Sequence, residues 1–83
     1  MNDPINKVLV VGDDDALRRA IARRLRGGGY QVLEAKTGIE ALQLMQRKPD
    51  LVALQAELPD IDGYEVCRRL RSQAETNHIP IKR

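Results

Sequence analysis

Two short segments carry the residues of this chain whose types and positions could support chemistry. The first is Gly12–Asp15, which contains three aspartates and directly follows the apolar run Lys7–Val11. The second is Gln55, which closes the apolar run Leu51–Leu54. Short apolar runs that end at turn signals are typical of strands buried on both faces, and the carboxyl ends of such strands face the crevice where ligands bind. The sequence therefore places Gln55 where chemistry would be expected.

Gln55 itself is poorly suited to chemistry, because its side-chain amide is neutral and neither titrates nor attacks. Asp14 or Asp15 can cap the helix that follows, since negative charge is favourable at a helix N-terminus. Capping explains one or two of the aspartates more easily than three. The single cysteine, Cys67, is interpreted as a packing residue, and the single histidine, His78, as a surface residue without ligand partners. We therefore predict that the chain is not an enzyme.

The length and composition predict one small domain over residues 1–83. The chain has no Phe and no Trp, so its core must be aliphatic. No run is long enough to cross a membrane, the N-terminus lacks the pattern of a signal peptide, and a single cysteine cannot form an internal disulfide. These observations predict a cytoplasmic protein.

Arginines are concentrated in two segments, although the net charge is only +2. Five of them fall between positions 18 and 26, and three between positions 68 and 71. We interpret both groups as solvated helix faces, because nucleic-acid surfaces usually combine a larger basic excess with aromatic residues. A basic module that contacts nucleic acid through the first group is an alternative, which salt-dependent retention on DNA would test.

Strand and helix patterns alternate along the chain. Strands are predicted at 7–11, 30–35 and 51–54, with the start of a fourth at 79–81. Helices are predicted at 15–26, from a Thr37–Glu40 capping box to about 47, and from 62 or 63 to about 72. The glycines at 27–29 should end the first helix, and the second strand should lie at an edge. This order predicts a parallel sheet with helices on both faces.

The spacing of apolar residues predicts which face each helix buries. The arginines of the first helix are expected on its exposed face. The side chains expected to point inward are Leu17, Ile21, Leu25, Ile39, Leu42, Met45, Val66, Cys67 and Leu70.

Five segments together resemble the receiver domain of bacterial two-component response regulators. They are residues 8–14, 37–42, 49–52, 58–70 and 79–81, which read VLVVGDD, TGIEAL, PDLV, LPDIDGYEVCRRL and IPI. These segments stand in the family's order and spacing and cover almost the whole chain. The resemblance implies an α/β fold with the flavodoxin-like, doubly wound parallel sheet of that family, in strand order 2-1-3-4-5. The fold is expected to be incomplete here, with three β-α units and the start of a fourth strand.

The resemblance also implies the positions of a phosphoryl-transfer site. The family accepts a phosphoryl group from a histidine kinase on an aspartate at the end of the third strand, and that position here is Gln55. An acidic pair after the first strand helps to hold Mg²⁺, and those positions are Gly12 and Asp13. The backbone carbonyl of Glu57 matches a further metal ligand. A Ser/Thr and a Lys that complete the family's site fall beyond Arg83.

These departures from the family pattern predict a loss of chemistry. An acyl phosphate needs a carboxylate nucleophile, which Gln55 lacks. Mg²⁺ depends on charged oxygen ligands, of which Asp13 alone remains, because Asp14 is expected to turn toward the helix terminus. We therefore expect no phosphorylation, no useful Mg²⁺ affinity and no cofactor. The prediction is a phosphorylation-independent pseudo-receiver that binds histidine kinases or regulator domains. The alternative is a fragment or variant of an active receiver.

The incomplete fold also predicts self-association. Without the family's fifth helix, the apolar surface of Val8, Val10, Val52 and Leu54 is expected to lack part of its cover. The third strand is expected to lack most of one neighbour. Uncovered strand edges and apolar patches are contact sites. We therefore predict a homodimer that uses the sheet face, the third-strand edge or both.

Overall fold

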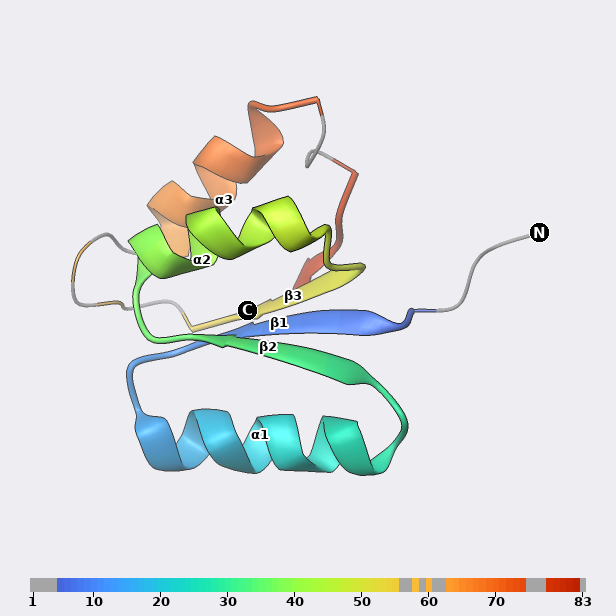
Figure 1. Ribbon diagram of the computed structural model, residues 1–83. Coiled ribbons are helices and arrows are strands. Elements are labelled where there is room, and N and C mark those ends of the chain that lie inside the picture. Colours follow the sequence, from blue (N-terminus) through green and yellow to red (C-terminus); the bar gives the residue numbers. More distant parts are fainter. Residues whose placement is uncertain (1–4, 56–57, 59, 61–62, 75–77, 83) are drawn as a thin grey trace.

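The computed structural model of the chain describes residues 5–55, 58, 60, 63–74 and 78–82. Strands and helices alternate through these residues, as the sequence predicts (Figure 1). The elements are β1 (Lys7–Val11), α1 (Asp15–Gly27), β2 (Gln31–Ala35), α2 (Gly38–Leu44), the short 3-10 helix η1 (Met45–Arg47), β3 (Leu51–Leu54), α3 (Gly63–Arg71) and β4 (Ile81–Lys82).

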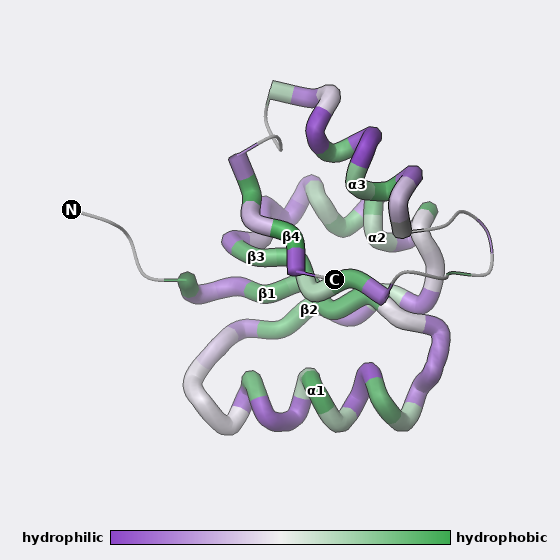
Figure 2. The backbone as a smooth tube through the Cα atoms, turned by 180° about the vertical axis from the view of Figure 1, so that it is seen from behind, coloured by the Kyte–Doolittle hydropathy of each residue, from purple (hydrophilic) through white to green (hydrophobic). Residues whose placement is uncertain are grey.

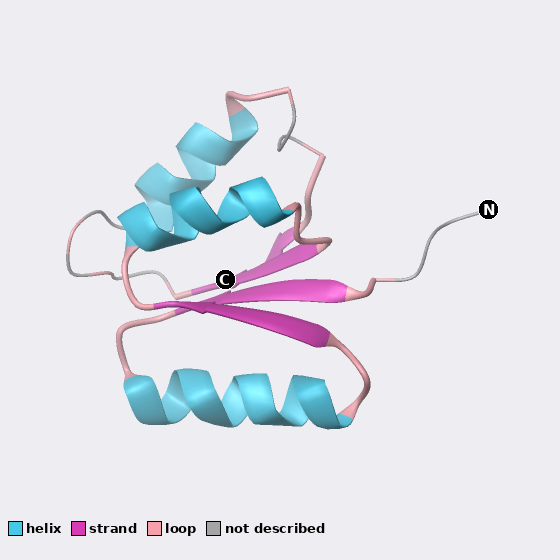
Figure 3. Cartoon of the chain, in the orientation of Figure 1, coloured by secondary structure: helices cyan, strands magenta, loops and turns pink. Residues whose placement is uncertain are grey.

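The strands form one parallel sheet in the order β2-β1-β3-β4. Strand β2 lies at an edge and β1 lies between β2 and β3, so the predicted strand order and the predicted edge strand are confirmed. Helix α1 covers one face of the sheet, while α2 and α3 lie side by side on the other (Figures 1 and 3). The predicted α/β architecture with helices on both faces is therefore confirmed.

The continuous core lies between the sheet and the α2–α3 layer. Strand side chains that alternate toward this layer are fully buried, with Leu9 and Val52 each 0 % exposed. Helix α3 contributes Val66 and Leu70, and α2 contributes Ala41 with Met45 directly after it. Apolar residues accordingly line the strands in Figure 2. The predicted aliphatic core is confirmed, and Cys67 packs against it at partial burial, as expected.

Helix α1 buries a different face from the one that its apolar spacing predicts. Leu17 is 55 % exposed and Ile21 is 37 % exposed, whereas Arg18 and Ala22 are buried. The reason is that α1 packs mainly against β2 and β1. The flank that carries Leu17 and Ile21 therefore faces along the sheet toward an uncovered region.

The predicted location of uncovered sheet surface is also wrong. Val8, Val10, Val52 and Leu54 are all at most 4 % exposed. Val52 and Leu54 point into the core beneath α2 and α3, while Val8 and Val10 alternate to the α1 side and are buried there. On the α1 side of the sheet, the apolar residues without full cover include Leu17 and Ile21 on α1 and the half-buried Leu51 and Ala53 on β3.

The ends of the helices follow local chemistry. Gly29, with φ +95°, turns the chain after α1. The Thr37 hydroxyl caps α2 by accepting from the Glu40 N–H at 3.0 Å. In a standard capping box the Glu40 carboxylate would accept from the Thr37 N–H, but here it accepts from the N–H of the preceding residue, Lys36. Ile39 was expected to point inward but is 44 % exposed, because Ala41 and Met45 occupy the buried face.

Element boundaries differ slightly from those expected. Strand β2 begins at Gln31 and β4 begins at Ile81, and the second helix narrows to a 3-10 turn over its last residues. That turn ends at Lys48, whose φ of +56° lies in the left-handed region. No helix within the described residues is long and apolar enough to cross a membrane.

Candidate functional site

Gly12 and Gln55 lie side by side at the carboxyl edge of the sheet. Their strands are adjacent and parallel, and the last paired residues are Val11 and Leu54. The Gln55 N–H donates to the Val11 carbonyl at 3.0 Å, and the Gly12 N–H donates to the Ala35 carbonyl at 3.0 Å. Because backbone hydrogen bonds hold both residues, their backbone positions are fixed relative to one another. The sequence prediction that Gln55 stands at the strand end is confirmed.

The Gln55 side chain occupies the space between the two segments. Its Nε2 donates to Asp13 Oδ1 at 2.9 Å. Its Oε1 lies 2.6 Å from the position that a Cβ at residue 12 would take. Among the described glycines only Gly29 has a positive φ, so Gly12 is not required by its backbone conformation. Gly12 instead provides the room in which the Gln55 amide lies.

The other acidic side chains of this segment have separate roles. Asp14 Oδ1 accepts from the Leu17 N–H at 3.0 Å and caps α1, so the predicted turn of Asp14 toward the helix terminus is confirmed. Glu57 lies outside the described residues. Within the described part of the chain, no group of three His, Cys, Asp or Glu side chains is placed to hold a metal ion.

Arg18 is a site residue that sequence reasoning missed. Its guanidinium is only 4 % exposed and makes three contacts: Nη1 donates to the Gly12 carbonyl at 2.8 Å, Nη2 pairs with Asp15 at 2.9 Å, and Nε donates to Glu34 at 3.2 Å. Burial acts to lower the pKa of Arg18, but its hydrogen bonds with Asp15 and Glu34 outweigh burial and raise it. The guanidinium therefore stays charged and holds the turn after β1 against α1 and β2.

The ion pairs continue across the surface from Arg18. Arg26 Nη1 lies 3.3 Å from Glu34 Oε2, and Lys36 Nζ lies 3.6 Å from Asp15 Oδ1. The Arg18 hydrogen bond lowers the pKa of Asp15. The first arginine group is therefore only partly a solvated face, which corrects the sequence interpretation. The signal that could have identified Arg18 is its i+3 spacing from Asp15, with the small Ala22 one turn later.

A cavity of about 340 Å³ opens on the α1 side of the sheet, beside Gln55 and Arg18. We call it the trench. Its walls are mostly apolar, with Lys82 at the β4 side, and they include Val10, Leu17, Ile21, Ala53 and Leu54. The polar edge of the sheet and the uncovered flank of α1 thus belong to one continuous depression.

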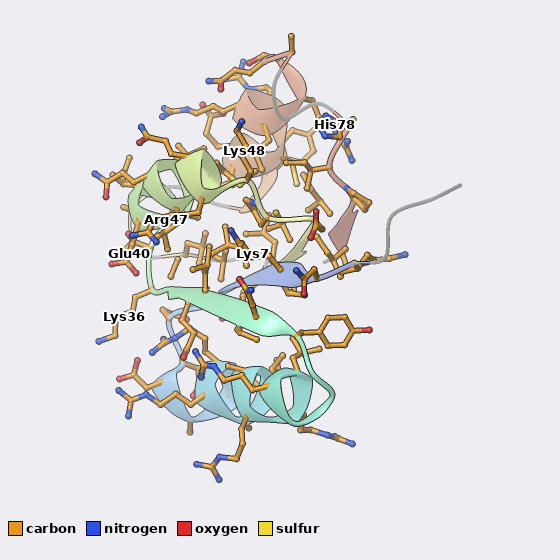
Figure 4. The ribbon with its side chains drawn as sticks, turned by 45° about the vertical axis from the view of Figure 1, so that its right-hand side comes forward. Lys7, Lys36, Glu40, Arg47, Lys48 and His78 are labelled. Atoms are coloured by element: carbon orange, nitrogen blue, oxygen red, sulfur yellow. The ribbon has the colours of Figure 1, made fainter. Side chains whose placement is uncertain are left out.

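At the amino-terminal ends of the strands, Asp50 joins the start of β1 to the start of β3. Its carboxylate accepts from the Lys7 N–H at 2.9 Å and from the Asn6 N–H at 3.0 Å, and these bonds lower the pKa of Asp50. Lys7 Nζ donates to the Arg47 carbonyl at 2.9 Å. The side chains of both residues are labelled in Figure 4. A smaller cavity of about 200 Å³ here includes the exposed His78, in agreement with its predicted surface position.

Comparison with known proteins identifies the family. The response regulator receiver domain family matches residues 8–82. Transcriptional regulatory protein AfsQ1 of Streptomyces coelicolor is 43 % identical over 75 residues, which are 89 % of this chain and 32 % of that protein. The chain therefore spans about a third of the length of the curated relatives it matches.

Solved structures agree in fold. A putative response regulator from Chloroflexus aurantiacus superposes with a TM-score of 0.88 at 39 % identity, covering 94 % of this chain and 65 % of that one. The receiver domain of a sensor histidine kinase from Pseudomonas aeruginosa, with a magnesium ion coordinated in its active site cleft, gives a TM-score of 0.86 at 30 % identity and the same coverage. With its strand order and its match over nearly the whole sequence, this chain belongs to the response regulator receiver domain family of two-component signalling.

Proposed function

We propose that this chain is a non-enzymatic receiver domain that works by protein contact and without phosphorylation. The observation that carries the proposal is the placement of the Gln55 amide, which binds Asp13 on one side and fills the space above Gly12 on the other. An amide supplies no carboxylate oxygen for an acyl phosphate. Histidine kinases or other regulator domains are the proposed partners.

The residues at this edge do not fit the magnesium ion that the family implies. Gly12 offers no side-chain ligand, and Asp13 Oδ1 is already engaged by Gln55 Nε2. A cation would have to displace that hydrogen bond and would gain a single charged ligand from the pair of positions after β1. Mg²⁺ dehydrates reluctantly, so it requires more charged oxygens than this. We propose that the hydrogen bond from Gln55 Nε2 stabilises the Asp13 carboxylate in place of a metal.

The test is intact-mass measurement after incubation with Mg²⁺ and acetyl phosphate. We expect no gain of a phosphoryl group, whereas a receiver that keeps aspartate at the strand end serves as the positive control. The Gln55→Asp variant should also label poorly, because Gly12 still lacks a carboxylate. A hydroxylamine-labile phosphoryl group on the unaltered chain would contradict the proposal and favour the alternative of an active receiver.

Metal binding is measured separately, by thermal unfolding with and without millimolar Mg²⁺. We expect no change for the unaltered chain. The Gly12→Asp, Gln55→Asp double variant places carboxylates together, so it should melt lower in EDTA and recover partly with Mg²⁺. Stabilisation of the unaltered chain by Mg²⁺ would contradict the assignment of Gln55 as the charge partner of Asp13.

Direct nucleic-acid binding is not part of the proposed function. Arg18 is buried, Arg26 pairs with Glu34, and Arg68 and Arg69 both pair with Glu65. These contacts reduce the basic surface that the sequence alone suggests. Retention on DNA that falls steeply with salt would argue against this view.

A further inference from the structure

Strand β2 forms the outer strand of the sheet on the side opposite β4. Its backbone hydrogen bonds show which of its groups β1 uses. The Gln31 N–H donates at 2.8 Å to the residue before β1, and the Ala35 carbonyl accepts at 3.0 Å from the residue after β1. Backbone groups alternate in direction along a strand, so the N–H and carbonyl groups of Val32 and Glu34 point away from β1. We call these four groups the β2 edge.

An arginine from the neighbouring helix occupies one group of the β2 edge. Arg26, in the last turn of α1, donates from Nη2 to the Val32 carbonyl at 3.2 Å. Its Nη1 lies 3.3 Å from Glu34 Oε2. The guanidinium therefore contacts both outward-facing residues of β2, although the Arg26 side chain is 53 % exposed. Within the described part of the chain, the other groups of the β2 edge have no hydrogen-bond partner.

Glu34 holds Arg26 in this position, and a buried group holds Glu34. The other carboxylate oxygen, Glu34 Oε1, accepts from Arg18 Nε at 3.2 Å. Arg18 is only 4 % exposed and is itself fixed by the Gly12 carbonyl and Asp15. A long, exposed side chain usually loses entropy when an ion pair holds it in one place. Because Arg18 already orients the Glu34 carboxylate, the planar Arg26 guanidinium loses less freedom when it pairs there.

The β2 edge is complementary to its own reverse. Its two residues are placed symmetrically about position 33, so an antiparallel β2 strand of a second copy would set Val32 opposite Glu34 of that copy. Each outward N–H would then face an outward carbonyl, as in a hydrogen-bonded antiparallel pair. A twofold contact requires this kind of self-complementarity, because each pairing occurs twice. A second copy of the chain can therefore satisfy every group of the β2 edge, once Arg26 leaves the Val32 carbonyl.

We propose that the β2 edge is a latent pairing surface for a second copy of this chain, and that Arg26 keeps it closed. An incoming strand must displace the guanidinium from the Val32 carbonyl and leaves Glu34 with one arginine partner in place of two. Folded proteins commonly use charged side chains at outer strands to prevent this kind of pairing. The proposal involves neither Gln55 nor Asp13, so it stands or falls separately from the proposed function.

Sedimentation equilibrium of the chain and its variants, from micromolar to millimolar concentrations, is the first test. Arg26→Ala should strengthen self-association at least about tenfold, because a twofold pair no longer has to break two guanidinium contacts. Arg26→Lys keeps the charge but lacks the planar fork, so it should strengthen association less. Arg24→Ala removes the same charge from an exposed position on the opposite side of α1 and is the matched control, with no effect expected. Circular dichroism checks the fold of each variant.

Amide hydrogen exchange, followed by NMR, locates the contact. In the unaltered chain, the Val32 and Glu34 amides should exchange quickly at every concentration, whereas the Leu33 amide, which faces β1, stays protected. In Arg26→Ala, the first two amides should become protected as the concentration rises.

Concentration-dependent protection of the Val32 and Glu34 amides in the unaltered chain would overturn the proposal, because the β2 edge would already be open. An Arg26→Ala chain that associates no more than Arg24→Ala would overturn it too, and so would added association that leaves both amides unprotected. Arg26→Lys is judged by the same criteria, which keeps the test decisive if the alanine variant is poorly folded.

Discussion

The two faces of this sheet are covered by helices to different extents. On the α2–α3 face, strand and helix side chains interlock until Leu9, Val52 and Val66 have no exposed surface. On the α1 face, a single helix covers β1 and β2 (Figure 1). The trench lies beside it, next to β3. In the part of the chain that the structure describes, the α2–α3 face is therefore the more completely packed, and most of the stability is expected to come from it.

The largest difference between the faces should appear on truncation of leucine. Leu9→Ala removes a fully buried side chain and should lower the free energy of unfolding by about 3 kcal/mol. Leu17→Ala removes a side chain that is 55 % exposed and should change it by no more than about 0.5 kcal/mol. Urea unfolding at low protein concentration measures both losses. Equal losses would mean that the α1 face is closed in solution.

Arg18 is the exception on the open face, because it is a buried charge with three partners. Arg18→Met leaves the Gly12 carbonyl without its donor and removes one of the two arginine partners of Glu34, and should cost about 2 kcal/mol. Arg68→Met removes an exposed pair with Glu65 on the opposite face and should cost about 0.5 kcal/mol or less. Chemical denaturation compares the two variants directly. An Arg18→Met variant as stable as Arg68→Met would show that the contacts of Arg18 contribute no more to stability than an exposed ion pair.

Gly12 and Gln55 lie at the carboxyl ends of adjacent strands. Their contact should make the effects of substitutions at the two positions on the free energy of unfolding non-additive. In the unaltered chain, Gly12→Ala pushes the Gln55 amide away from Asp13 and should cost about 1 kcal/mol. In a Gln55→Ala background the same substitution has room, so the cost should largely vanish. A double-mutant cycle on unfolding free energies gives the coupling. Additive effects would mean that the two side-chain positions are independent.

The smallest predicted effect is the loss of the Asp50 contribution to stability at acidic pH. Backbone N–H groups of Lys7 and Asn6 lower the pKa of Asp50 from 3.8, so the carboxylate stabilises the fold above its unfolded pKa. That contribution is lost as pH falls through the lower, folded pKa. The difference in urea midpoint between the native chain and Asp50→Asn should therefore narrow from about pH 5 to about pH 3.

Salt distinguishes this carboxylate from the one on α3. Hydrogen bonds from Arg68 and Arg69 lower the pKa of Glu65, and both arginines are exposed. Salt should weaken the Glu65 contribution more than that of Asp50, because mobile charged side chains are screened whereas short backbone hydrogen bonds are not. An equal salt response of Asp50→Asn and Glu65→Gln would contradict the backbone origin of the Asp50 effect.

Sequence patterns predicted the elements and their order well, because alternating apolar runs and capping residues act locally. Thr37, Asp14 and the glycines after α1 all act within a few residues of their position in the chain. The predicted burial of the third helix was correct for the same reason. Its apolar residues Val66 and Leu70 face a continuous core, so periodicity alone selects the inward face.

The side-chain environment of α1 could not be predicted in this way. Apolar spacing marks Leu17 and Ile21 as inward, but which neighbours are present to bury them depends on where α1 crosses the sheet. Burial of Arg18 requires two partners outside its helix. Glu34 lies on β2, and the Gly12 carbonyl lies in the turn before α1. The position of Gln55 at the strand end followed from the sequence. Its placement in the space that a side chain at position 12 would occupy did not, because it depends on how two neighbouring strands align.

The fit between Gln55 and Gly12 has a consequence for how such a chain can change over generations. A carboxylate gained first at position 12 would meet Oε1 of Gln55, so the Gln55 side chain would have to move and give up its hydrogen bond to Asp13. A change at position 55 removes the obstruction before anything is added at position 12. Of these two sites, position 55 is therefore the one at which a first change toward an acidic residue meets no obstruction from the other.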